Sequence, residues 1–168
     1  PTKGKWIRPL SFNGSEWILE EPNFPKGGKP LYRLHEIISH PNEKVWIVEG
    51  EKCADALAKL GLLATTSGSA TSAEGADWSV LSGRGVKVWP DNDGPGLKYA
   101  KDVTEQLLPL DYDVKWVDIS KLGWSDAADG ADAVDWLHPD ATKEDIEALA
   151  LIVPEQDNAP SSDSHQGN

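Results

Sequence analysis

Acidic residues follow directly after two short apolar runs of the sequence. Glu49 follows residues 45–48, and Asp91 and Asp93 follow residues 86–89. Each run is continuous and rich in β-branched and aromatic residues, as is typical of a buried strand. In an open parallel sheet, ligands bind in the crevice beyond the carboxyl ends of the strands. Three carboxylates at one such edge predict a site for a hard divalent cation.

The spacing of these acids suits Mg²⁺ or Mn²⁺. Mg²⁺ prefers oxygen ligands and is usually held by one or two carboxylates together with substrate phosphates. Asp91 and Asp93 are two residues apart, so both side chains point the same way from an extended segment. Glu49 is expected to complete the site or to act as a general acid or base, and Gly50 lets backbone approach a ligand. A different interpretation remains for residues 91–96, because Asp-Asn-Asp-Gly-Pro-Gly is also a good turn sequence.

The segments around these acids alternate between strand and helix patterns. Strands are predicted at residues 45–48, 62–66, 86–89 and 114–117, and helices at 51–60, 76–81 and 97–108. This order predicts an α/β fold with a four-stranded parallel sheet and helices on both faces. One more helix is predicted from the N-cap Thr142 to about residue 152.

The two ends of the chain have a different composition. Residues 1–40 are expected to form a small N-terminal extension, with a β-hairpin of residues 5–8 and 16–19 around Asn13-Gly14-Ser15 and a loop at 22–30. The main domain is expected over residues 41–153. Residues 154–168 are polar and predict a disordered linker, as expected of a piece of a larger protein.

Bulk composition limits the classes of function. The net charge is −12, from 16 basic and 28 acidic residues, whereas proteins that bind nucleic acid by themselves usually carry a basic stripe. Bound metal and neighbouring domains would have to supply positive charge. Cys53 is the single cysteine, which excludes an internal disulfide and a Cys-rich zinc site. No apolar run is long enough to span a membrane and no signal peptide is recognised at the start. Together with the single cysteine, these features lead us to expect a cytoplasmic protein.

Two motifs together resemble the Toprim domain shared by primases, topoisomerases and some nucleases. They are Val48-Glu49-Gly50-Glu51-Lys52 and Asp91-Asn92-Asp93-Gly94-Pro95-Gly96. The pattern Glu-Gly-Glu-Lys-x-x-Asp-Ala-Leu at 49–57 is most similar to the primases of phages, plasmids and integrated mobile elements. Residues 30–34, 89–93 and 132–137 fit the same subgroup, so the resemblance covers about residues 30–137.

The resemblance implies a Toprim (Rossmann-like) domain of a mobile-element DNA primase or primase–helicase that transfers nucleotides with Mg²⁺. It makes Glu49 the catalytic acid or base and Asp91 and Asp93 catalytic, metal-binding residues, with Asp132 as a further metal ligand. Phosphate contacts are expected from three residues: Gly50, Lys52 and Lys98. Lysines on helix surfaces are more often solvated, and a solvated acidic loop is an equal alternative for Asp126, Asp129 and Asp135.

The implied partners are nucleoside triphosphates, a single-stranded DNA template and a helicase domain or protein. Two alternatives stay open: a Toprim nuclease that uses the same acids, and a docking module of a replication protein that performs no chemistry. The sequence departs from many bacterial primases at Cys53, where those proteins place an aspartate, and Asp55 follows two residues later.

Overall fold

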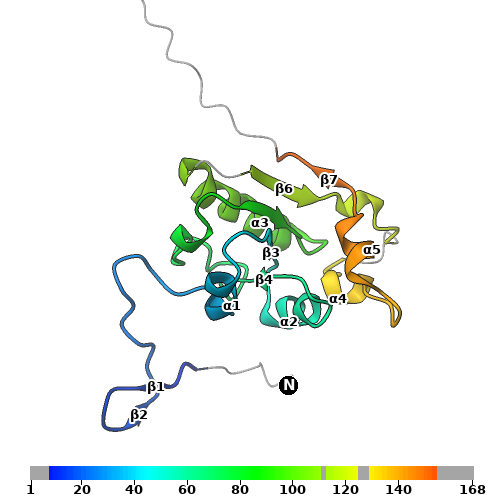
Figure 1. Cartoon of the computed structure of the whole chain (residues 1–168). Coiled ribbons are helices and arrows are strands. Elements are labelled where there is room, and N and C mark those ends of the chain that lie inside the picture. The colour runs from blue at the N-terminus through cyan, green and yellow to red at the C-terminus, as the bar shows by residue number, and fades with distance from the viewer. Residues whose placement is uncertain (1–7, 111–112, 125–128, 155–168) are drawn as a thin grey trace, which may run out of the picture.

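The protein is a mixed α/β structure built on one mostly parallel sheet (Figure 1). The computed structural model describes residues 8–110, 113–124 and 129–154. The sheet has five strands in the order β4-β3-β5-β6-β7. Their bounds are β4 Ala64–Thr65, β3 Val45–Ile47, β5 Gly85–Val88, β6 Asp113–Val117 and β7 Leu151–Ile152. The four predicted strands are present and parallel, but β7 pairs antiparallel with β6 and was not predicted.

Helices cover both faces of the sheet, as predicted (Figure 1). One face carries α1 Leu34–Ser39, the short 3₁₀ helix Ser79–Leu81 and the long helix α3 Gly94–Leu107. The other face carries α2 Glu51–Lys59, α4 Ala133–Trp136 and α5 Lys143–Glu147. Two further 3₁₀ turns lie at Leu108–Leu110 and Ile119–Lys121. No helix in the described ranges is long and apolar enough to cross a membrane.

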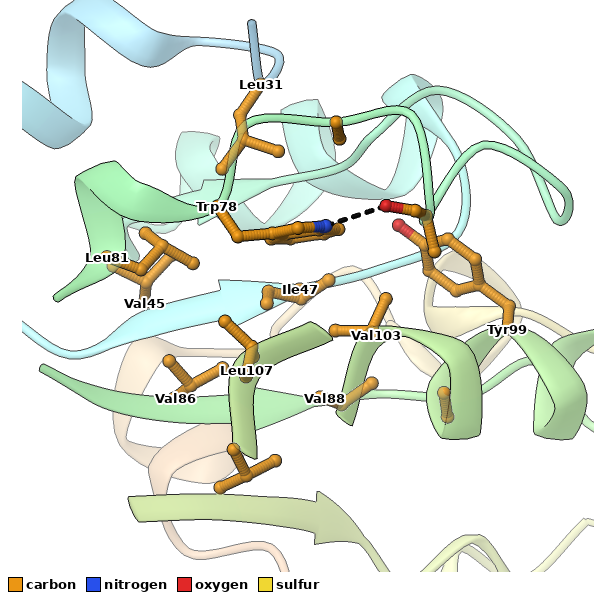
Figure 2. Close-up of a cluster of buried hydrophobic side chains, with 14 of the residues drawn as sticks. Leu31, Val45, Ile47, Trp78, Leu81, Val86, Val88, Tyr99, Val103 and Leu107 are labelled. Atoms are coloured by element: carbon orange, nitrogen blue, oxygen red, sulfur yellow. Dashed lines mark hydrogen bonds between the residues drawn. The ribbon is translucent and has the colours of Figure 1, made fainter. Parts of the chain in front are cut away.

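The core on the α3 face interlocks branched side chains of the strands with the apolar side of the helix (Figure 2). Val45 and Ile47 of β3 lie beside Val86 and Val88 of β5, and all four are at most 1% exposed. Trp78 covers this layer, and its indole Nε1–H donates to the carbonyl of Ala73 at 2.7 Å. Burial of each such side chain stabilises the fold by about 1.5–3 kcal/mol.

The core on the opposite face contains a row of tryptophans. Trp46 and Trp89 have ring centroids 6.2 Å apart, and Trp89 meets Trp136 edge-on at 5.6 Å. The lone cysteine, Cys53, is buried in this cluster, which confirms its role as a small core residue. Burial raises the pKa of its thiol to about 12, so it is not a reactive thiolate at neutral pH.

The hairpin forms around the predicted turn, but with other strand bounds. The strands are β1 Ser11–Phe12 and β2 Trp17–Ile18, paired antiparallel. The Asn13 side-chain oxygen accepts from the backbone N–H groups of Ser15 and Glu16, which closes the turn. The predicted strand at 5–8 lies almost wholly outside the described residues, as does the predicted linker beyond Pro154.

Residues 29–39 join the main sheet through hydrogen bonds and packing. The backbone of Lys29 exchanges hydrogen bonds with Gly75 and Asp77, both at 2.8 Å. Leu31 and Ile37 are 3% and 0% exposed within the α3-face core. The chain is therefore tied to the main sheet well before residue 40.

Two predicted helices differ from the structure. The segment 76–81 forms only the 3₁₀ turn Ser79–Leu81, whose N-cap is Trp78. The Asp77 carboxylate accepts from the backbone N–H of Ser79 at 3.0 Å, in a local turn that precedes it. The helix that starts at Thr142 ends at Glu147, and the residues expected to continue it form β7. Thr142 is the predicted N-cap and forms a capping box with Asp145, so the start of this helix is confirmed.

Candidate active site

The predicted acids lie where two neighbouring parallel strands end. β3 pairs with β5 in parallel register, with Ile47 opposite Val88. Glu49 comes two residues after β3, and Asp91 comes three residues after β5. Because parallel strands end at the same edge of the sheet, both side chains lie at its carboxyl edge. Both side chains are half-buried, so their carboxylates are partly shielded from water.

The carboxyl of Asp91 has a strongly perturbed pKa. Burial is the largest cause, and the charges of Glu49, Asp132, Asp93 and Asp135 add to it, so that the pKa of Asp91 rises to about 7. Burial, followed by the charge of Asp93, also raises the pKa of Glu49. Five carboxyl groups therefore share one electrostatic environment, and we call them the acidic cluster. Carboxyl groups with perturbed pKa values that lie together are typical of functional sites.

Asp93 has a structural role as well as a charge. Its Oδ1 accepts from the backbone N–H of Gly96 at 2.6 Å, which makes Asp93 the N-cap of α3. The preceding turn is held by the loop that precedes α4: the N–H of Asn92 donates to Ala131 at 2.8 Å, and Gly130 donates to Asn92 at 3.1 Å. This pairing brings Asp132 to the acidic cluster although it lies far along the chain.

Asp132 is engaged on both of its oxygens. Oδ1 caps α4 by accepting from the N–H groups of Val134 and Asp135, and Oδ2 faces Lys52 Nζ at 3.2 Å. Burial acts to raise the pKa of Asp132, but the hydrogen bonds from Lys52 and the backbone outweigh it and the pKa is lowered. Asp135 lies in the first turn of α4 rather than in a loop, and both it and Asp129 are exposed. Asp126 lies outside the described residues.

The three residues predicted to contact phosphate lie in different settings. Lys52 is ion-paired with Asp132, at the rim of the acidic cluster. Lys98 is ion-paired with Asp102 one turn along α3. Gly50 is the N-cap of α2, and a Cβ at its position would meet no atom within 4 Å, so open space lies beside it. Of the three, Gly50 and Lys52 border the acidic cluster most directly.

A buried hydroxyl network supports Glu49 and was not predicted. Thr66 Oγ1 donates to the backbone carbonyl of Glu49 at 2.6 Å. Tyr99 of α3 reaches the same place, with its hydroxyl 2.9 Å from Ser67 Oγ and 3.2 Å from the Ser67 backbone nitrogen. Ser67 Oγ in turn lies 2.8 Å from Ser72 Oγ. The sequence marks residues 67–72 as a loop of small polar residues, but the link from that loop to Glu49 depends on the tertiary fold.

The donor set fits Mg²⁺ as an open site. Within the described ranges, no three His, Cys, Asp or Glu side chains are placed to hold a metal ion by themselves. Mg²⁺ does not need three protein ligands, because it keeps waters and substrate phosphates in its shell. The ionisable groups of the acidic cluster are all carboxyls, the ligand type that this ion prefers.

Replacement of Asp91 by asparagine is expected to stabilise the metal-free protein above neutral pH. The unfolded chain ionises this carboxyl near its ordinary value of 3.8, whereas the folded chain resists ionisation up to about 7. The resulting penalty grows as pH rises between these two values and stays constant above them. With allowance for solvent screening, Asp91→Asn should be more stable by ~2 kcal/mol at about pH 8 and by roughly half as much at about pH 5.

Urea unfolding in EDTA at the two pH values measures this difference. Asp140→Asn, at an exposed loop position, is the matched control. A less stable Asp91→Asn protein at the higher pH would contradict the assigned electrostatics.

Comparisons with known proteins give one structural similarity. No protein family model matches this chain, and no curated protein matches it. The chain is similar to the crystal structure of a DNA primase domain from Pseudomonas aeruginosa, with 22% sequence identity and a TM-score of 0.44. The similarity covers 66% of this chain and 37% of that chain, so the matched part spans little more than a third of the primase domain's length.

Proposed function

We propose that this chain is a Toprim-type nucleotidyl-transfer domain that synthesises primers in the primase or primase–helicase of a mobile genetic element. The observation that carries the proposal is the carboxyl of Asp91, whose pKa of about 7 reflects burial among like charges at the carboxyl edge of the sheet. Carboxylates held close together in a half-buried site repel one another, and a bound cation would offset this repulsion. The reaction class comes from the resemblance of the two sequence motifs to Toprim domains. The acids of these motifs, Glu49, Asp91 and Asp93, lie at this same edge of the sheet.

In this proposal, Asp91 and Asp93 hold Mg²⁺ and Asp132 supports them. Bound Mg²⁺ would offset charge on the triphosphate of an incoming nucleotide. Asp93 keeps Oδ1 on the cap of α3, so Oδ2 is the atom that it offers. Glu49 exchanges the proton of the attacking hydroxyl, for which a raised pKa is suitable. Lys52, next to Asp132, is placed to meet a phosphate that approaches over Gly50.

The net charge of −12 limits what this chain does alone. A single-stranded template would be repelled by the acidic surface without cations or basic neighbours. We therefore propose that a helicase domain or protein supplies most of the contacts with the template. The docking-module alternative does not account for the buried charge of Asp91, because docking does not require charges to be gathered in a half-buried site.

Calorimetry with Mn²⁺ tests the metal site first. The wild-type chain should bind Mn²⁺, and Asp91→Asn/Asp93→Asn should not. Asparagine at residue 93 preserves the N-cap of α3, so the double variant is expected to fold. Asp140→Asn is the control of equal chemistry at an exposed loop position. Binding that survives in the double variant would overturn the assignment of these carboxylates.

Two activity assays then separate the reaction classes. A primase extends or starts a chain on single-stranded DNA only when nucleoside triphosphates and metal are both present. A nuclease shortens the same DNA with metal alone. Degradation without synthesis would replace the primase proposal by the nuclease alternative, and absence of metal binding together with absence of both reactions would favour the docking module.

A further inference from the structure

A lysine lies in the central strand at a position where a parallel sheet normally carries an apolar side chain. Lys87 is on β5, between Val86 and Val88, which point into the α3-face core. Successive side chains of a strand alternate between faces, so Lys87 points to the face that carries α2, α4 and α5. Strands of a parallel sheet covered on both faces are usually apolar throughout. Lys87 is only half-buried there, so this face has an opening.

The strand register places an aromatic ring on one side of Lys87 and a second lysine on the other. Trp46 of β3 and Lys115 of β6 are its direct partners on the two neighbouring strands. The Nζ of Lys87 lies 4.5 Å from the centroid of a Trp46 ring, in a cation–π contact. Lys44, directly before β3, packs its side chain beside Gly85 at the start of β5. Lys87 and Lys115 therefore lie within β5 and β6, and Lys44 lies at the amino end of β3.

A cavity of about 400 Å³ opens at this place, and we call it the lysine cavity. Lys44 and Lys87 line it together with Lys143 of α5, and Trp46 forms part of its apolar wall. Lys44 and Lys87 also line a smaller neighbouring cavity of about 130 Å³ that includes Lys115. The acidic cluster lies at the opposite edge of the sheet, because Lys44 precedes β3 whereas Glu49 follows it.

Only part of the positive charge that lines the lysine cavity is paired within the described residues. Lys143 pairs with Glu147 at 3.9 Å and Lys115 with Asp113 at 3.4 Å. Lys44 and Lys87 form no ion pair with any residue that the structure describes. Burial, followed by the charge of Lys44, lowers the pKa of Lys87; Lys115 acts in the same direction and Glu147 against it. An anion between Lys44 and Lys87 would relieve this repulsion.

We propose that the lysine cavity binds a phosphoryl group, such as the diphosphate part of a small molecule, through the ammonium groups of Lys44 and Lys87. The charge-assisted bonds from two ammonium groups suit a compact anion with several oxygens. An extended polyanion is disfavoured, because the carboxylates of Glu43 and Glu147 also line the cavity. This site is separate from the acidic cluster and does not depend on the function proposed above.

Calorimetry with inorganic pyrophosphate in EDTA tests the proposal. EDTA removes divalent metal, so pyrophosphate cannot bind to the acidic cluster through a metal ion. Wild type should bind, and Lys87→Met and Lys44→Gln should each bind about tenfold or more weakly, as loss of a charge-assisted contact predicts. Lys87→Met keeps an unbranched side chain over Trp46, so folding should be preserved. Lys101→Gln, on the exposed side of α3, is the control and should bind as wild type does.

Further arms identify the source of the phosphoryl group. If ATP in EDTA binds as tightly as pyrophosphate, the phosphates alone are recognised. If ATP binds more tightly than pyrophosphate, the ligand is a nucleotide. The proposal is overturned if pyrophosphate does not bind, or if it binds equally to wild type and both cavity variants. It is also overturned if a short single-stranded DNA binds there and pyrophosphate does not compete.

Discussion

Replacement of Glu49 by glutamine is expected to lower the rate of the proposed primer synthesis about 10²- to 10⁴-fold, the usual contribution of a general acid or base. Glutamine keeps the size of the side chain and the backbone carbonyl that accepts from Thr66 Oγ1. The fold at the end of β3 should therefore be intact, and only proton exchange is lost. Mn²⁺ binding should weaken much less than the rate, because Asp91 and Asp93 remain.

Glu51→Gln is the matched control, because Glu51 is two residues away, exposed and in the first turn of α2. It removes the same charge without touching the acidic cluster and should retain nearly wild-type synthesis. Rates are measured at saturating Mg²⁺ and nucleotide, so that a change in affinity is not read as a change in chemistry. Equal losses of rate in the two variants would show that Glu49 acts only through overall charge, and would remove its catalytic role.

The core of the fold was predictable because its signals are local. Residues 45–48 and 86–89 are short apolar runs with strand-forming side chains, and both became neighbouring strands of the sheet. Thr142 and Asp145 carry the capping box of α5 within four residues. The link from strand ends to the acidic cluster was also predictable, because parallel topology brings strand ends to one edge.

The remaining features depend on contacts between distant segments. β7 lies at the end of the helix predicted from Thr142 to about residue 152, yet Leu151 and Ile152 pair with the last residues of β6. The hydroxyl network of Thr66, Ser67 and Tyr99 joins a loop to α3. Lys87 interrupts the apolar run at residues 86–89, but what surrounds it depends on the register of β3, β5 and β6.

Gly96→Ala is expected to destabilise the protein by ~2 kcal/mol and to disturb the proposed metal site, because Gly96 packs directly on Asp91. A Cβ at residue 96 would lie 2.6 Å from the carbonyl oxygen of Asp91 and 2.8 Å from its backbone nitrogen. Backbone atoms cannot rotate away, so α3 or the turn at Asp91 must shift, at the usual cost of overpacking. The intrinsic preference of helices for alanine, about 1 kcal/mol, offsets only part of this cost.

Gly94→Ala provides the control within the same turn of α3. Gly94 is exposed, and a Cβ there would meet no atom within 4 Å, so stability should be unchanged or slightly raised. Urea unfolding gives the stability difference, and Mn²⁺ calorimetry at a temperature where both variants are folded gives the effect on Asp91. Weaker Mn²⁺ binding in Gly96→Ala alone would show that the geometry of the acidic cluster depends on the close packing of α3 on the turn at Asp91. Equal stability and binding in both variants would mean that the turn yields without moving Asp91, and that Gly96 does not shape the site.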